Sequence, residues 1–153
     1  MFGDIMKVIK GDAVTAVIDN EIDLLLHVAN CQGKMGSGIA LTIKQKIPSA
    51  YEAYKKFEED KGLTLGTLSS NGTVINLHAQ EFYGYDGKRY LDYEALAKSL
   101  EIVKNAIDKH EKTYKIGLPF KMGCDRAGGN WEIVSSIISH YLSKHEILVY
   151  KLK

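Results

Sequence analysis

The segment with the clearest chemical content runs from His27 to Ala40. It follows an apolar run at 24–26, places His27 at the end of that run, and then becomes rich in glycine where a helix is expected to begin. Glycine leaves space for a ligand against the backbone and permits positive φ angles. Backbone N–H groups at the amino terminus of a helix favour an anion. The order strand, glycine loop and helix therefore predicts a phosphate- or nucleotide-binding edge.

The glycine spacing matches neither the Walker A pattern nor the dinucleotide-binding fingerprint, which argues against an NTPase or a dehydrogenase. His27 is a candidate acid–base group, because imidazole titrates near neutral pH; the alternative is a histidine hydrogen-bonded within the sheet. Cys31 lies in this glycine loop and Cys124 in a second one described below, but neither is followed by an arginine at the Cys-x5-Arg spacing of cysteine phosphatases. We expect both to be small packed residues.

A second glycine-rich segment, Pro119–Trp131, also leads into a helix. Within it, Asp125 is expected to activate water or orient a sugar, with helix capping as the alternative. Arg126, Lys121 and, in the first loop, Lys34 are expected to neutralise phosphate or else to be solvated surface charges.

Periodicity and turn residues predict strands that alternate with helices, which favours a three-layer α/β/α domain. Ligands bind such sheets outside the carboxyl ends of the strands, where Gly11-Asp12, 27–38 and 119–130 would meet. Ser49 and Glu52 form a capping-box pattern, and Asn71-Gly72 is a hairpin signal. The expected strands are 5–9, 24–28, 63–70, 73–78, 116–119 and 147–152, and the expected helices are 36–46, one from 49, 92–110 and 131–142.

The composition places limits on the class of protein. A chain of 153 residues with 45% hydrophobic and 25% charged residues is typical of a globular domain. A net charge of +1 gives no sign of a nucleic-acid-binding patch. Two cysteines, no zinc-like spacing, no signal peptide and no membrane-length apolar run leave a cytoplasmic protein as the expectation. We expect one domain over residues 1–153, a monomer without metal or other cofactor and without membrane association.

The order of these motifs resembles the macrodomain family, whose members bind ADP-ribose. The resemblance extends from Gly11-Asp12 to 149–152 and is closest to the subgroup with the yeast ADP-ribose 1″-phosphate phosphatase, the human terminal ADP-ribose glycohydrolase macrodomain and phage relatives. These share a His…(Met/Trp)-Gly-x-Gly-Ile-Ala segment, here His27–Ala40, and a loop from Pro through Gly-Cys to Trp, here Pro119–Trp131. It implies an α/β/α fold with a central mixed sheet.

The resemblance also implies roles for particular residues. Asp12 would bind the adenine amino group, the first loop would enclose the distal ribose and part of the diphosphate, and the second would place N–H groups on the diphosphate. The catalytic candidates are His27 and Asp125. The expected ligand contacts are Asp12, Asn30, Gly33, Lys34, Met35, Gly36, Ser37, Gly38, Pro119, Gly123, Cys124, Arg126, Ala127, Gly128, Tyr150 and Leu152.

One departure from that subgroup bears on the reaction. The lysine that attacks the ribose in the human glycohydrolase aligns with Gln80, which cannot form a Schiff base, and its aspartate aligns with Ala127. We therefore expect a hydrolase that removes phosphate from ADP-ribose 1″-phosphate. The alternatives are a non-catalytic reader of ADP-ribose and a de-ADP-ribosylase acting on protein or nucleic acid. The loop with Tyr83, Tyr85 and Tyr90 is expected to cover the distal ribose or to be a surface loop.

Overall fold

The computed structural model describes residues 6–84, 86, 88–124 and 127–152. Their strands form a six-stranded sheet in the order β1-β6-β5-β2-β4-β3, in which neighbouring strands are parallel except β3 and β4. The sheet is therefore mixed, as the resemblance to the macrodomain family implied. The strands are β1 (Met6–Lys10), β2 (Leu24–Asn30), β3 (Leu68–Ser70), β4 (Val74–Gln80), β5 (Lys115–Pro119) and β6 (Glu146–Lys151).

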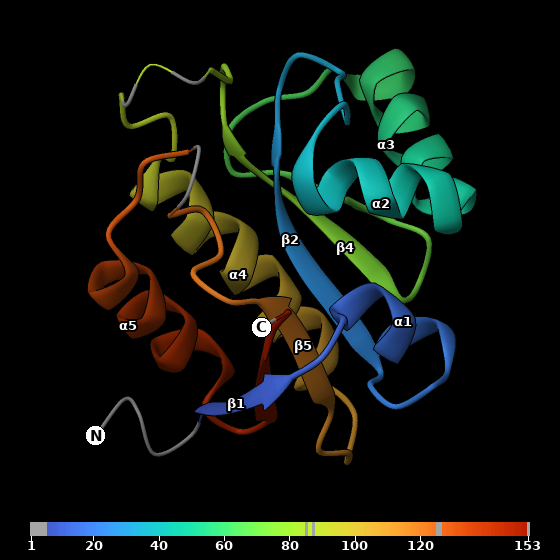
Figure 1. The fold of residues 1–153 in the computed structure, drawn as a ribbon, viewed down its shortest axis with the longest axis vertical. Coiled ribbons are helices and arrows are strands. Elements are labelled where there is room, and N and C mark those ends of the chain that lie inside the picture. Colours follow the sequence, from blue (N-terminus) through green and yellow to red (C-terminus); the bar gives the residue numbers. More distant parts are fainter. Residues whose placement is uncertain (1–5, 85, 87, 125–126, 153) are drawn as a thin grey trace.

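Helices cover both faces of this sheet (Figure 1). One apolar cluster joins the sheet to α4 and α5, and the other joins it to α1, α2 and α3. The three-layer α/β/α fold is confirmed. The described part of the chain has no helix long and apolar enough to span a membrane. The helices are α1 (Ala13–Ile18), α2 (Gly38–Lys46), α3 (Pro48–Lys61), α4 (Tyr93–Ile107) and α5 (Trp131–Leu142).

Strand β2 lies between β5 and β4 and is covered on both faces, which is why its sequence is apolar without polar alternation. Leu24 and Leu26 pack in the cluster on the α4–α5 side, whereas Leu25 and Ala29 pack in the cluster on the α1–α3 side. By the same alternation His27 faces the α1–α3 side. This orientation decides what His27 contacts.

Most of the expected elements are present, with some differences. The strand expected over 63–70 is shorter, because β3 covers only Leu68–Ser70. The short helix α1 was not expected; Asp12 caps it by accepting hydrogen bonds from the N–H groups of Val14 and Thr15 at 2.8 and 3.3 Å. The capping box at Ser49 is wrong, because α3 begins at Pro48 and makes no side-chain cap. Ile5, the expected first residue of β1, lies outside the described residues.

A directed chain of buried side-chain hydrogen bonds crosses β2, β4 and β3 under α3. His27 Nε2 lies 2.6 Å from Asn76 Oδ1, and Asn76 Nδ2 donates to Ser69 Oγ at 3.1 Å. His78 Nε2 lies 2.9 Å from Ser69 Oγ, and its Nδ1 lies 2.8 Å from the hydroxyl of Thr67. Since Asn76 Oδ1 can only accept, His27 is protonated on Nε2, and its buried Nδ1 has no partner.

Both imidazoles of this chain are held in the neutral form. Burial lowers the pKa of His27 to about 4, although its hydrogen bond to Asn76 opposes the shift. Burial, followed by the proximity of His27, lowers the pKa of His78 to about 4. Burial thus opposes a second proton on either imidazole, so both histidines are neutral at pH 7.

We predict that the protein loses stability as the pH falls from about 6.5 to about 4. The folded-state pKa of each histidine lies below its unfolded value, so the unfolded chain binds more protons in this window. Each histidine then contributes a slope of up to about 1.4 kcal/mol per pH unit. Urea unfolding at a series of pH values measures the slope. His78→Gln is expected to reduce it by about half, and a slope unchanged in that variant would contradict the assignment.

Candidate functional site

A cavity of about 490 Å³ opens at the carboxyl ends of β2, β4 and β5. This is the edge at which the sequence placed the ligand. Its walls are the loop between β2 and α2, the loop after β5, and the segment after β4, which lie around the upper half of the molecule in Figure 1. The lining residues are Val28, Ala29, Asn30, Lys34, Gly36, Ser37, Gly38, Ile39, Ala40, Gln80, Tyr83, Gly84, Pro119, Phe120, Lys121, Met122, Gly123 and Ala127.

The amino end of α2 forms the first wall. The amino ends of α1, α4 and α5 are capped by side chains, but Ser37, the N-cap residue of α2, makes no side-chain cap hydrogen bond. The first turn of α2 contains no acidic residue, and Gly38, Ile39 and Ala40 line the cavity. Uncapped N–H groups at this end of the helix dipole attract an anion.

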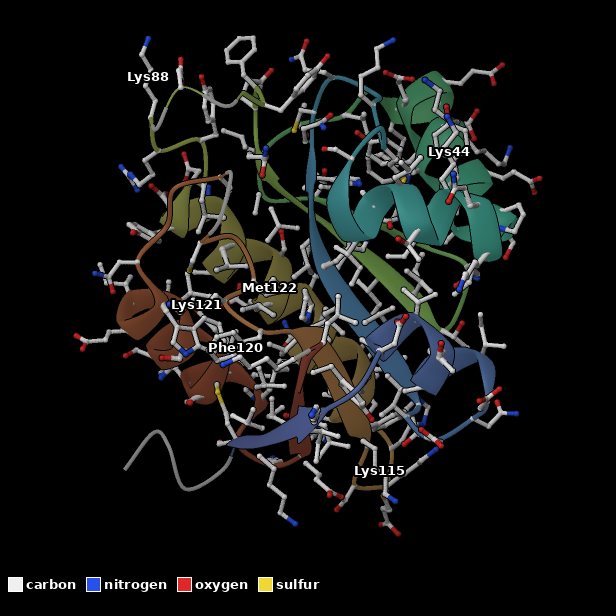
Figure 2. All side chains as sticks on the ribbon, viewed as in Figure 1. Lys44, Lys88, Lys115, Phe120, Lys121 and Met122 are labelled. Atoms are coloured by element: carbon white, nitrogen blue, oxygen red, sulfur yellow. The ribbon has the colours of Figure 1, made fainter. Side chains whose placement is uncertain are left out.

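The loop after β5 forms the opposite wall. It turns tightly, since the N–H of Cys124 donates to the Lys121 carbonyl at 2.8 Å and Gly123 has a φ of 74°. A Cβ at Gly123 would lie 3.0 Å from the side chain of Leu91, so glycine fits this position closely. Figure 2 shows Phe120, Lys121 and Met122 on this loop, with Lys115 at the other end of β5.

The described residues that line the cavity carry a net positive charge. Among the described residues that line it, Lys34 and Lys121 carry a charge, and none is acidic. Both lysines are exposed, so the cavity favours an anion without burying a charge.

The segment after β4 forms the third wall and is joined to the loop after β5. The N–H groups of Tyr90 and Leu91 both donate to the Ala127 carbonyl, at 2.7 and 2.9 Å. Gln80 and Tyr83 line the cavity from this segment, and Gln80 donates to the Phe82 carbonyl at 2.9 Å. Gln80, which the resemblance aligned with the attacking lysine of the human glycohydrolase, thus lies on the cavity wall.

Asn30 and Gly33 illustrate how the first loop is built. Asn30 lines the cavity, but its side chain also closes a turn by donating to the Lys34 carbonyl at 2.8 Å and accepting from the Gln32 N–H at 2.9 Å. Gly33 is buried and does not line the cavity. Its N–H donates to the hydroxyl of Tyr54 at 3.1 Å, so this N–H is already bound within the protein and gives no support to the ligand contact expected for Gly33.

His27 and Met35 lie beneath the site instead of on its surface. Neither lines the cavity; His27 is fully buried against Asn76, and Met35 packs in the apolar cluster on the α1–α3 side. Alternation along β2 points the His27 side chain into the helical layer, and this placement gives no support to the direct acid–base role expected for it. Met35 is likewise a core residue.

Two expected contacts in the second loop serve packing. Gly128 does not line the cavity, has a φ of 72°, and would place a Cβ 2.7 Å from the Lys88 carbonyl oxygen. Cys124 is half-buried, and its thiol donates to the Met122 carbonyl at 3.4 Å. Gly128 is thus required by the segment that passes behind it, and the ligand contact expected for it stays a prediction.

The residues expected around adenine lie outside the cavity. Asp12 is engaged as the cap of α1, and the ring of Tyr150 lies 3.7 Å from the Cβ that Gly11 would carry. Leu152 is 72% exposed after the end of β6. The structure therefore does not bring these three residues to the cavity wall.

The expected contacts that do line the cavity are Asn30, Lys34, Gly36, Ser37, Gly38, Pro119, Gly123 and Ala127. Asp125, Arg126 and Tyr85 lie outside the described residues. Within the part of the chain that is described, no group of three or more His, Cys, Asp or Glu side chains is arranged to hold a metal. Phe120 and Met122 also line the cavity, but the sequence analysis did not identify them. Both are apolar and resemble core residues, and the signal that could have found them is their place directly after a strand.

No profile of a protein family matches the chain. It is 30% identical to an uncharacterised 17.5 kDa protein of Enterobacteria phage T4, with 95% of both chains covered. It is 26% identical to an ADP-ribose 1″-phosphate phosphatase of Debaryomyces hansenii, over 92% of this chain and 96% of that one. It is also 28% identical to an ADP-ribose glycohydrolase of Bos taurus, over 96% and 90% of the two chains.

Solved structures share the fold. A protein of unknown function from Bacteroides thetaiotaomicron is 28% identical and has a TM-score of 0.78, with 95% of this chain and 96% of that chain covered. The macrodomain of Thermus aquaticus DarG is 22% identical and has a TM-score of 0.74, with 95% and 97% covered. At that identity the second likeness establishes the fold alone.

We predict that both thiols react slowly with iodoacetamide. Burial raises the pKa of Cys31 to about 11, with a smaller contribution from Glu81, and burial raises the pKa of Cys124 to about 11 despite Lys121. The thiolate fraction at pH 8 is then about 100-fold below that of an ordinary thiol, partly offset by higher thiolate reactivity. Mass spectrometry is expected to show alkylation about tenfold slower than for glutathione. An alkylation rate equal to that of glutathione would contradict the prediction and make a nucleophilic role for the cysteine a candidate again.

Proposed function

Because the chain belongs to the macrodomain family, we propose that its cavity binds ADP-ribose and that it hydrolyses the phosphate of ADP-ribose 1″-phosphate. The observation that carries this proposal is the uncapped amino end of α2, which opens on a cavity whose described charged residues are Lys34 and Lys121. ADP-ribose 1″-phosphate carries anionic groups at its diphosphate and at its distal ribose. A cavity with two separate cationic loops suits such a ligand.

The distance between the two loops in sequence supports the same proposal. Lys34 belongs to the loop before α2 and Lys121 to the loop after β5, so the two cations come from different walls. Both walls also include glycines at the surface, and a Cβ at Gly36 would meet nothing within 4 Å. The phosphate groups of the ligand can therefore approach the backbone N–H groups of the protein closely enough to accept hydrogen bonds from them.

In this proposal hydrolysis depends on positioning and on electrostatic stabilisation of the transferred phosphate. Water attacks the phosphate ester, and ADP-ribose and inorganic phosphate are released. We propose that Asp125, which lies in sequence between the lining residues Gly123 and Ala127, orients the water. His27 acts indirectly, by fixing β2 through Asn76.

A reader of ADP-ribose is the second candidate function. It is favoured by one observation: among the described lining residues, none has a carboxylate or imidazole that could transfer a proton. A glycohydrolase like the Bos taurus relative is a further candidate, although Gln80 excludes a Schiff base at its position. Turnover distinguishes these candidates from the phosphatase.

Gly36→Trp is expected to abolish both ADP-ribose binding and phosphate release from ADP-ribose 1″-phosphate. Gly36 lines the cavity, and its φ is outside the left-handed region, so the indole occupies ligand space without straining the backbone. Calorimetric titration and phosphate release at saturating substrate measure the two effects. Lys109→Trp, at an exposed position after α4, is the matched control. Wild-type protein that binds ADP-ribose without releasing phosphate would exclude the phosphatase and leave the reader and the glycohydrolase as candidates.

Lys34→Gln and Lys121→Gln are each expected to weaken ADP-ribose binding by about two- to fivefold, the range for an exposed ion pair. The loss is expected to shrink as salt rises, because exposed charges are screened. Titrations at 50 and 500 mM salt measure both effects. Lys56→Gln is the control, since Lys56 lies on α3 and pairs with Asp60. Equal affinity in all three variants would remove the lysines from the site.

A further inference from the structure

The contacts of α3 with the loop before α2 carry a further inference, which rests on the proposed function. We propose that Tyr54, on α3, is a positioning residue that holds this loop in the shape required for ADP-ribose. Tyr54 itself is fully buried and does not line the cavity. It therefore acts on the ligand only through the loop.

The hydroxyl of Tyr54 joins the end of β2 to the loop. It donates to the Asn30 carbonyl oxygen at 2.6 Å, with Asn30 Oδ1 also at 2.9 Å, and it accepts from the Gly33 N–H at 3.1 Å. A phenol has one hydrogen to donate, so the shorter contact to the Asn30 carbonyl takes it. Burial raises the pKa of Tyr54, so this hydrogen remains in place throughout the neutral range.

The same contacts reach the part of the loop that lines the cavity. Asn30, whose side chain touches the Tyr54 hydroxyl, donates to the Lys34 carbonyl at 2.8 Å. Lys34 lines the cavity, as does Gly36, two residues further on. Tyr54 therefore fixes both ends of the turn whose far end forms the cavity wall.

A second contact from α3 holds the loop at Gly33. Lys55 Nζ donates to the Gly33 carbonyl at 3.2 Å and pairs with Glu58 at 2.6 Å. A Cβ at Gly33 would overlap the Glu58 carboxylate. With the bond to Tyr54, both backbone polar groups of Gly33 are bound by α3, so this glycine serves the helix and not the ligand.

Helix α3 is itself fixed to the sheet. Asn76 on β4 donates to the Ala50 carbonyl at 3.2 Å. The Tyr54 ring packs against the imidazole of His78, with 5.7 Å between the two ring centroids. A rigid support allows a single hydroxyl to determine where the loop lies.

Tyr54→Phe removes the hydroxyl and keeps the ring, and the matched control is Tyr51→Phe on the same helix. Among the described hydrogen bonds, the Tyr51 hydroxyl makes none to the loop. We expect Tyr54→Phe to weaken ADP-ribose binding by about five- to twentyfold and to accelerate hydrogen exchange at the Gly33 amide. Tyr51→Phe is expected to change neither. Affinity within twofold of wild type in Tyr54→Phe would overturn the proposal.

Two further measurements separate positioning from general stability. Ile138→Val, in the cluster on the α4–α5 side, lowers stability without touching the loop and is expected to retain wild-type affinity. An equal loss of affinity in Ile138→Val would overturn the positioning role. If Tyr54→Phe does not fold, hydrogen exchange at the Gly33 amide of the wild-type protein is the test. Strong protection is expected from the bond to the Tyr54 hydroxyl, and exchange as fast as in an unstructured peptide overturns the proposal.

The proposed function fails separately. If wild-type protein does not bind ADP-ribose, the proposed function is overturned. Faster exchange at Gly33 in Tyr54→Phe then still supports the placement of the loop by Tyr54, and unchanged exchange overturns it.

Discussion

Backbone N–H groups beside the cavity are either satisfied by other parts of the protein or left free for a ligand, and the site depends on this division. The N–H of Gly33 is bound by Tyr54, whereas the amino end of α2 has no side-chain cap. A buried, unpaired N–H is costly, so groups that stay free must be at a surface that water or a ligand can reach. The cavity at Gly38–Ala40 is that surface. The two glycines thus differ in their surroundings, since Gly33 is held by α3 within the protein and Gly36 lies open at the cavity.

The parallel core of the sheet brings these groups together. Strands β2, β4 and β5 are parallel neighbours, so the loops at their carboxyl ends meet although they lie far apart in the sequence. Their shared wall is strengthened by the bonds from Tyr90 and Leu91 to Ala127. A polar chain under α3, from His27 to Thr67, is compatible with this packing because its described members share hydrogen bonds, with the exception of His27 Nδ1.

Local patterns in the sequence were sufficient to predict the layers and both loops. The hairpin at Asn71-Gly72 is confirmed, since Asn71 Oδ1 accepts from the N–H groups of Thr73 and Val74 and Gly72 has a positive φ. The eight expected contacts on the cavity wall come from segments whose glycines follow strands, which is a signal within one stretch of chain. The short helix α1 was missed because six residues give little periodicity.

The placements of Gly33 and His27 depend on contacts between distant parts of the chain. Nothing near Gly33 in the sequence shows that Tyr54, Lys55 and Glu58 surround it, so it resembled the open glycine at Gly36. Alternation along β2 shows from the sequence that the side chains of His27 and Leu25 point to the same face of the sheet. Which face that is depends on the helices packed against it, and those are determined by the whole fold.

In the proposed complex ADP-ribose binds between the two loops, with the N–H groups at the start of α2 facing it. Nuclear magnetic resonance of ¹⁵N-labelled protein during a titration with ADP-ribose tests this most directly. We expect the largest amide shift changes at Gly38, Ile39, Ala40 and Gly123, and small changes at the far end of β5 near Lys115. No shift changes at saturating ADP-ribose, or the largest changes outside the cavity, would show that the ligand does not bind between these loops.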